Sequence, residues 1–363
     1  MYTENIALNT CNNARSNDSP ESLSTVNIIK QSLLNFRPNS ELSFEDKSTI
    51  YCSLVALVKE QYRFDNDLLN RAAWLLRNLA PFGKDRESAA AKLVTDLVPS
   101  SAGSPSGFVE SILVLFSSPD SKLVSTALLF LFRILSISSP AVRLLLVDSD
   151  LFTNLFVIFR PHTLLLSGNG SIADSLIRNI QDLLELSFPS TLRKLGITAS
   201  ADAFNHREMI FRKLVVPSSR FVTSLISKRC VLNQEFFHST IIMLGTLLQI
   251  GPFHHATLEF ILASPIVFTF ISSLDRQEEW NVIPSIDLSL KGWKIQGPEV
   301  LQSGKLIVQA LFSEGLEDAL EQMLKYDEDT PSRGIIEEMC LSIFMLLGAN
   351  NSKPPYPHPP FWA

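Results

Sequence analysis

Cysteine, glycine and charged residues are scarce in this chain of 363 residues, and proline is no more than ordinary in number; each of these features excludes a class of protein. The 4 cysteines are far apart and form no C-x-x-C pair, which excludes a disulfide-dense scaffold and a zinc knuckle. The 14 glycines and 20 prolines are too few for a collagen-like or low-complexity chain. Charged residues make up only 19%, against 46% hydrophobic residues, so the chain has the material for a core.

Long apolar runs and targeting signals are also missing. The most apolar stretch, residues 123–135, is interrupted by Ser125, Thr126 and Arg133 and is shorter than the roughly 20 apolar residues that cross a bilayer. The first ten residues lack the basic and apolar regions of a secretory signal. We therefore expect no membrane span, reduced thiols and a cytoplasmic protein, with the nucleus as the alternative location.

Motifs of catalysis and ligand binding are absent from the sequence. It contains no G-x-S-x-G, G-x-x-x-x-G-K-[ST] or H-E-x-x-H pattern. Residues 168–173 match the loose dinucleotide pattern G-x-G-x-x-A, but no predicted strand precedes them, and a turn before a helix is the simpler interpretation. His254 and His255 are adjacent, not one helical turn apart, which is poor spacing for a shared metal. We expect no enzyme activity, cofactor or metal, and the net charge of -6 does not favour nucleic-acid binding.

The two ends of the chain differ in composition from its middle. Residues 1–38 are rich in Asn, Ser and Thr, and we expect them to form a flexible leader with at most a turn or two of helix. Residues 351–363 are rich in proline, which cannot continue a helix, so a disordered tail is expected. Within this tail Pro354, Pro357 and Pro360 satisfy P-x-x-P, a pattern that can bind the aromatic groove of an SH3- or WW-type domain.

One apolar pattern recurs through the remaining domain, residues 39–350. Apolar or small side chains at relative positions 0, 1, 4, 5, 8, 11 and 12 form one wide face of an α-helix. Five segments follow this pattern, and a sixth departs from it in its middle. The regular copies begin at Leu68, Leu123, Ile172, Phe236 and Ile335, and the irregular copy begins at Val300.

Shorter apolar helices are predicted before several of these copies, and the spacing of each pair repeats. Phe108 and Phe221 are 113 positions apart, as are Leu123 and Phe236. A single helical hairpin cannot bury so wide an apolar face, so neighbouring hairpins must cover one another. The fold predicted from this pattern is an all-α, armadillo/HEAT-like right-handed α-solenoid, a superhelix of stacked helical hairpins.

Residues 72–80, with the sequence AAWLLRNLA, resemble the third helix of an armadillo repeat. Residues 108–136 resemble a whole repeat, with its inter-helix turn at residues 117–120. Over roughly residues 40–350 the chain is similar to an expanded protist family of armadillo-like proteins that has no assigned activity. Residues 98–107 and 197–206 depart from the compact armadillo period of about 42 residues, and we interpret them as insertions.

The resemblance also indicates candidate binding residues. Trp74 and Asn78 are one helical turn apart, and Asn70 lies on the same predicted face. In armadillo adaptors such as importin alpha, the equivalent Asn amide binds the backbone of an extended peptide and the Trp flanks a side-chain pocket. Those adaptors repeat the pair, whereas the next copy in this chain has Leu129 and Arg133. The alternative is that Trp74 packs between repeats and Asn78 is a surface amide.

We therefore expect a non-enzymatic scaffold that binds a partner protein or peptide on the concave face of a solenoid. Two other functions stay open. One is a transport adaptor of the importin-alpha type for basic peptides, which requires an acidic, Asn-lined groove; the other is a helical regulatory subunit of a kinase or phosphatase. Residues 207–229 are basic and residues 314–338 acidic, which can steer charged partners or simply reflect solvated helical faces.

Overall fold

The structure is a computed structural model, and it describes most of the chain between residues 43 and 316. The described residues are 27, 30–31, 33–34, 43–62, 64–81, 84–98, 106–158, 170–227, 234–273, 276–316 and 342–343. All the regular secondary structure in these residues is helical. The protein is therefore all-α over the part that the structure describes.

The helices are mostly short, and several are joined by single-turn 3₁₀ or π segments. In the first half they are α3 (Phe44–Lys59), α4 (Asn66–Leu79), α5 (Arg86–Asp96), α6 (Ser106–Phe116), α7 (Ser121–Ile137), α8 (Pro140–Asp148), α9 (Leu151–Ile158), α11 (Gly170–Leu184), η1 (Glu185–Ser187) and α12 (Pro189–Lys194). In the second half they are α13 (Ser200–Ile210), η2 (Phe211–Val215), α14 (Val216–Ser227), α15 (Gln234–Ile250), η3 (Gly251–Phe253), α16 (His255–Ala263), α17 (Ile266–Ser273), α18 (Arg276–Gln296), α19 (Pro298–Leu311) and η4 (Phe312–Leu316).

Short polar residues define where several helices begin. Ser43 and Asp46 form a capping box at the start of α3, and the Asp65 side chain accepts a 2.8 Å hydrogen bond from the Leu68 amide at the start of α4. Such caps satisfy amide groups that have no partner within the helix. Pro140 occupies the first turn of α8, where its missing amide hydrogen has no cost.

The apolar pattern in the sequence correctly locates five helices of 14 to 17 residues, but not α18, which has 21. Its copies beginning at residues 68, 123, 172, 236 and 300 lie in α4, α7, α11, α15 and α19, respectively, to within one residue at the end of α4 and α19. The copy beginning at residue 335 lies outside the described residues except for Ser342 and Ile343, and Ile343 is fully buried. The predicted shorter helices at residues 108–116 and 221–226 are α6 and part of α14.

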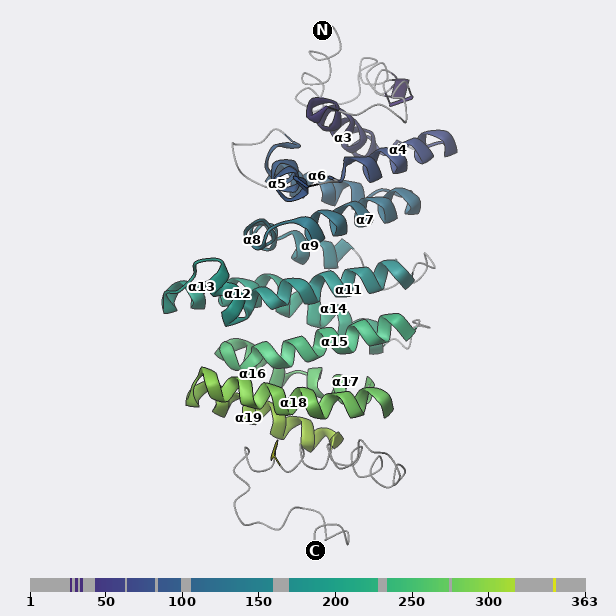
Figure 1. The fold of residues 1–363 in the computed structure, drawn as a ribbon. Coiled ribbons are helices and arrows are strands. Elements are labelled where there is room, and N and C mark those ends of the chain that lie inside the picture. Colours follow the sequence, from purple (N-terminus) through teal and green to yellow (C-terminus); the bar gives the residue numbers. More distant parts are fainter. Residues whose placement is uncertain are drawn as a thin grey trace, which may run out of the picture.

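The helices pack in two rows that run along the molecule (Figure 1). In the first row, α4 packs on α7, α7 on α11 and α11 on α15. In the second row, α3 packs on α6, α6 on α9, α9 on α14 and α14 on α17. Contacts such as that of α6 with α7 join the rows, and a helix inside either row is covered by its counterparts before and after it in the chain.

The four helices α6, α7, α8 and α9 correspond to α14, α15, α16 and α17 later in the chain. The helices α7 and α15 are both 17 residues long and begin at residues 121 and 234, which are 113 positions apart. The spacing seen in the sequence therefore reflects a group of four helices that occurs twice in the structure.

Successive helices of the first row run in the same direction, as α11 and α15 show. Near the starts of these helices, Ser239 donates a hydrogen bond to the buried carboxylate of Asp174. Just beyond their ends, the rings of Phe188 and Phe253 lie 6.4 Å apart. Equivalent positions of the apolar pattern therefore lie side by side on neighbouring helices.

A single apolar core follows the two rows from one end of the described chain to the other. Leu54, Leu131, Leu183, Leu247 and Val308 are buried members of it that come from five different helices. Each such side chain stabilises the fold by roughly 1.5–3 kcal/mol when buried. Because no helix buries its apolar face alone, stability depends on contacts between neighbours.

Several sequence expectations concern residues at or outside the limits of the described chain. The expected insertion at residues 197–206 contains the start of α13, whereas residues 99–105 of the other expected insertion lie outside the described residues. The tail at 351–363, with Pro354, Pro357 and Pro360, also lies outside them.

Part of the expected leader packs against the first two described helices. Most of residues 1–38 lie outside the described chain, but Leu33 is only 1% exposed. Lys30 donates hydrogen bonds to Tyr62 at 2.8 Å and to Asp65 at 3.0 Å.

No single helix among the described residues has both the length and the apolar composition of a membrane span. The pair His255–Ala263 and Ile266–Ser272 passes the same test together, with a 60° bend between them.

Candidate functional site

The three candidate residues from the sequence lie on one face of α4, in the first row. Asn70 and Asn78 are exposed, and Trp74, between them, is half-buried against the core. The side-chain amide of Asn78 donates a 2.7 Å hydrogen bond to the carbonyl of Trp74 within the same helix. The structure therefore brings the trio together, with Trp74 contributing to packing as well as to the surface.

The neighbouring helix α7 adds positive charge to this face. Lys122 donates a hydrogen bond to the side-chain oxygen of Asn70, and Arg133 is exposed at the α7 position that is equivalent to Asn78. The same position is Asp182 in α11 and Thr246 in α15. The first row therefore presents four different side chains there, not a repeated amide.

Apolar side chains are exposed at the position that Trp74 occupies in α4. In α7 this position is Leu129, which is 41% exposed, and in α15 it is Ile242, which is 39% exposed. In α11 it is Arg178. We call the surface that contains Trp74, Leu129, Arg178 and Ile242 the first-row face. Its two exposed aliphatic side chains, Leu129 and Ile242, lie at equivalent positions of α7 and α15, on either side of Arg178 of α11.

A polar cluster fixes α11 against α15 beneath this face. Asp174 is 8% exposed and accepts hydrogen bonds from Ser239 of α15 and from Arg178, whose Nε lies 3.1 Å from Asp174 Oδ2. Arg178 Nε also lies 3.3 Å from the Ser239 hydroxyl oxygen. The cluster satisfies a carboxylate that would be costly to bury alone.

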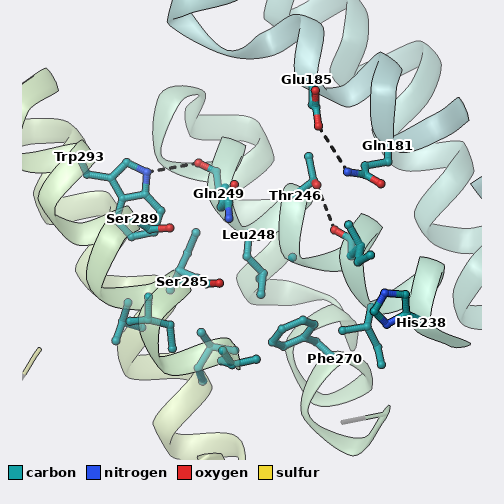
Figure 2. A pocket seen from close by; sticks show the side chains of 18 residues that line it. Gln181, Glu185, His238, Thr246, Leu248, Gln249, Phe270, Ser285, Ser289 and Trp293 are labelled. Carbon is teal, nitrogen blue, oxygen red and sulfur yellow. Dashed lines mark hydrogen bonds between the residues drawn. The ribbon is translucent and has the colours of Figure 1, made fainter. Parts of the chain in front are cut away.

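The first-row face ends in a cavity of about 340 Å³ between α15 and α18 (Figure 2). There α18 packs mainly on α19 and contacts α15 less closely, so the helix-on-helix packing of the first row is interrupted. Among the residues that line the cavity, the large apolar ones are Ile241, Ile242, Leu248, Phe270, Val282, Ile286, Trp293, Ile307, Val308 and Leu311. Those with polar groups are Gln181, Glu185, His238, Thr246, Gln249, Ser285 and Ser289. We call this cavity the α15–α18 groove.

A second hollow of about 380 Å³ continues the groove along α18. The two share Gln249, Ser285, Ser289 and Trp293, so they form one elongated depression. The second hollow adds an exposed apolar side chain, Leu288, a charged one, Arg193, and the half-buried rings of Phe188 and Phe253.

Trp293 forms the wall that the two hollows share, and a glycine holds it in place. Its indole Nε1 donates a 3.3 Å hydrogen bond to the Gln249 carbonyl, as Figure 2 shows. Its ring covers Gly304 of α19 so closely that a Cβ atom at Gly304 would lie 2.1 Å from Trp293 Cε3. Only glycine fits at position 304 with the ring in this orientation.

A second glycine opens the α15 side of the groove. Gly245 lies in the middle of α15 and lines the cavity. A Cβ atom there would make an ordinary contact of 3.8 Å with Phe270 Cε2, so the fold does not exclude a side chain. The missing side chain instead leaves space in the groove.

The basic segment that follows residue 207 is largely neutralised in the structure. Arg212 forms an ion pair with Glu208, and Lys213 Nζ lies 3.1 Å from Asp148 Oδ1 and 3.5 Å from Asp150 Oδ2. Lys228 and Arg229 lie outside the described residues. The described part of this segment therefore joins helices together more than it forms a free basic surface.

The adjacent side chains of His254 and His255 lie in different environments. His254 is buried, with Nδ1 3.0 Å from the Thr257 hydroxyl oxygen and Nε2 3.2 Å from Glu208 Oε2, whereas His255 is exposed and lies 3.3 Å from Glu259. Burial lowers the pKa of His254, and Arg207 and His255 act in the same direction, while Glu208 opposes them. His254 serves to connect α13 with α16.

No protein-family model matches the chain, and no curated protein shows significant similarity to it. The assignment of the site therefore depends on its geometry. Sequence reasoning did not identify the groove, because α18 does not follow the apolar pattern. The one signal for it was Gly245, a glycine inside an otherwise regular helical copy.

Proposed function

We propose that the chain is an armadillo/HEAT-like right-handed α-solenoid that acts as a non-enzymatic scaffold and binds a partner protein or peptide on its first-row face. Two rows of helices in which each helix packs on its counterparts support this fold. The group of four helices that occurs twice, with its members beginning 110 to 115 residues apart, supports it further. Stacked repeats of this kind present an extended surface to a partner.

The exposed apolar positions of the first-row face carry the functional proposal. Leu129 and Ile242 are exposed at the same position of two helices, in line with Trp74, and Ile242 borders the α15–α18 groove. Aligned apolar side chains beside a groove are typical of a surface that a partner covers.

The charge of this face favours a general scaffold over an adaptor for basic peptides. Such an adaptor requires acidic residues beside its amides, whereas Lys122 of α7 contacts Asn70, and Arg133 occupies the α7 position equivalent to Asn78. A regulatory subunit of a kinase or phosphatase is a narrower form of the scaffold function. Copurification with that activity would distinguish it.

Affinity purification of the full chain with variants of the face tests the proposal. Leu129→Glu and Ile242→Glu place charges on exposed apolar positions, and we expect both to lose at least one partner that the unaltered chain retains. Leu145→Glu is the matched control, because Leu145 is a comparably exposed leucine on α8, outside the face.

Thermal unfolding should show that all three variants are folded, since the altered side chains are exposed. A set of bound proteins that is the same for the face variants and for the control would contradict the proposal.

A further inference from the structure

We infer that the α15–α18 groove is the docking site for one amphipathic helix of a partner protein, with apolar side chains against Phe270 and against Trp293 and a Lys or Arg beside Glu185. This inference depends on the proposed scaffold function. It adds the place at which the partner binds and the chemistry of the segment that binds there.

The shape of the groove suits a segment of chain. The two hollows share Trp293 and form one depression instead of a closed pocket. On α15 the lining of the first hollow extends from His238 to Gln249, which corresponds to roughly 16 Å at 1.5 Å per residue. A helix of about three turns has this length.

The interruption of the first row favours a helix as the occupant. Each earlier helix of the row is covered by the next, as α11 is covered by α15. At α15 this order stops: Ile241, Ile242 and Leu248 line the groove, and Ile242 is 39% exposed there. An amphipathic helix with apolar residues at i, i+3, i+4 and i+7 would extend the packing that the row already uses.

The charges of the first hollow favour a basic residue on the part of the helix beside Glu185, whereas Arg193 lines the second hollow. Among the described residues that line the first hollow, Glu185 is the one carboxylate, and no Lys or Arg is present. Glu185 is exposed, and its Oε1 lies 3.4 Å from the neutral amide of Gln181. Figure 2 shows Glu185 and Gln181 at one margin of the cavity and Phe270 toward the opposite margin. The occupant would therefore be apolar on one side and basic near its edge.

Substitutions at Gly245 can distinguish a groove that binds a partner from a groove that is only a defect in packing. Glycine is among the poorest residues for the interior of a helix, and its replacement here by alanine meets only an ordinary contact with Phe270. If the groove were merely a packing defect, filling it would only stabilise the protein. A docking site predicts that the same change also weakens binding.

The test uses the full chain and two displayed peptide libraries. One library contains helical peptides of about 18 residues with Leu, Phe or Trp at i, i+3, i+4 and i+7, and the other contains unpatterned peptides of the same length. Selected peptides are then titrated by fluorescence anisotropy against the unaltered chain, Gly245→Ala, Gly245→Leu and Glu185→Lys. The matched control is Ala141→Leu, which adds a leucine at an exposed position of α8.

We expect the patterned library to yield helical peptides that carry Lys or Arg at one flank. Gly245→Leu should weaken their binding at least about tenfold, and Gly245→Ala severalfold without lowering the melting temperature. Glu185→Lys should weaken binding roughly tenfold at low salt and less at high salt. Ala141→Leu should leave binding unchanged.

Three results would overturn the inference. Peptides that lose affinity with Leu129→Glu but not with Gly245→Leu would show that the scaffold binds on its face and not in the groove. Unpatterned peptides that compete for the groove in an extended conformation would exclude a helix as its occupant. A failure of both libraries to yield any binder would contradict the scaffold function as well.

Discussion

Gly304 shows how a single residue can explain an irregularity in the sequence. The copy of the apolar pattern that begins at Val300 has glycine where the regular copies have larger or helix-favouring residues. In the structure the Trp293 ring occupies the space in which a side chain at position 304 would lie. The irregular copy is therefore a helix that has adapted to a large neighbour.

We predict that Gly304→Ala destabilises the protein even though alanine favours helices. The added methyl group would lie 2.1 Å from Trp293 Cε3, and overpacking of this kind costs about 1–3 kcal/mol. Urea unfolding followed by circular dichroism measures the change in the free energy of unfolding.

Gly292→Ala is the control, because a Cβ atom at Gly292 has no neighbour within 4 Å. This variant should be as stable as the unaltered chain, or more stable by up to about 1 kcal/mol. Equal stability of Gly304→Ala and the unaltered chain would show that Trp293 can move aside at no cost.

Only part of the candidate site could be predicted at the scale of residues. The one-turn spacing of Asn70, Trp74 and Asn78 correctly places them on one face of α4, because helical geometry fixes that relation. Periodicity does not reveal what a neighbouring helix contributes. The contact of Lys122 with Asn70 and the position of Trp293 on Gly304 both come from other helices, and no local pattern predicts them.

Much of the fold could be predicted at the scale of elements. Helices with one wide apolar face, such as α7 and α11, are evident because burial of that face requires apolar residues at fixed intervals. The helix α18 was not predicted, since it is mixed in composition and borders a groove, so its apolar residues do not form one continuous stripe. The packing of neighbouring hairpins on one another was inferred because a single hairpin cannot bury its wide apolar face.

The contact between α13 and α16 should make stability depend on pH through His254. Burial lowers the pKa of His254 from its ordinary value of 6.5, so the unfolded chain binds a proton more readily than the folded chain. The contribution of His254 is therefore complete above about pH 7 and is lost as the pH falls through 6.5 toward the lower pKa of the folded state.

We expect the free energy of unfolding to decrease between about pH 7.5 and 5.5 and to decrease less in His254→Asn. Asparagine is a favourable residue before a helix, so this variant should fold. The control is His255→Asn, at an exposed neighbouring position, which should keep the pH dependence of the unaltered chain. The same slope in both variants would assign the pH dependence to other groups.

At the scale of the whole molecule, the arrangement in two rows means that the stability of each helix depends on the helices packed directly against it. Contacts within the described chain join mainly helices that are adjacent in a row or paired between rows. In an arrangement of this kind, total stability approximates a sum of local stabilities and interfaces between neighbours. A destabilising substitution in one helix should therefore affect that helix and its direct neighbours in the rows, and not distant helices.

We predict that two equivalent core substitutions destabilise different parts of the molecule. Leu131 of α7 and Leu244 of α15 are 113 positions apart, and both are completely buried. Replacement of either by alanine leaves a cavity and costs about 2–5 kcal/mol of the free energy of unfolding.

Because α7 packs on α4 and α11, Leu131→Ala should accelerate amide hydrogen exchange in those three helices and leave α18 and α19 nearly unchanged. Leu244→Ala should accelerate exchange in α11 and α15 and leave α3 nearly unchanged. Equal acceleration throughout the chain in both variants would indicate one cooperative unit and contradict the neighbour-dependent stability that a solenoid requires.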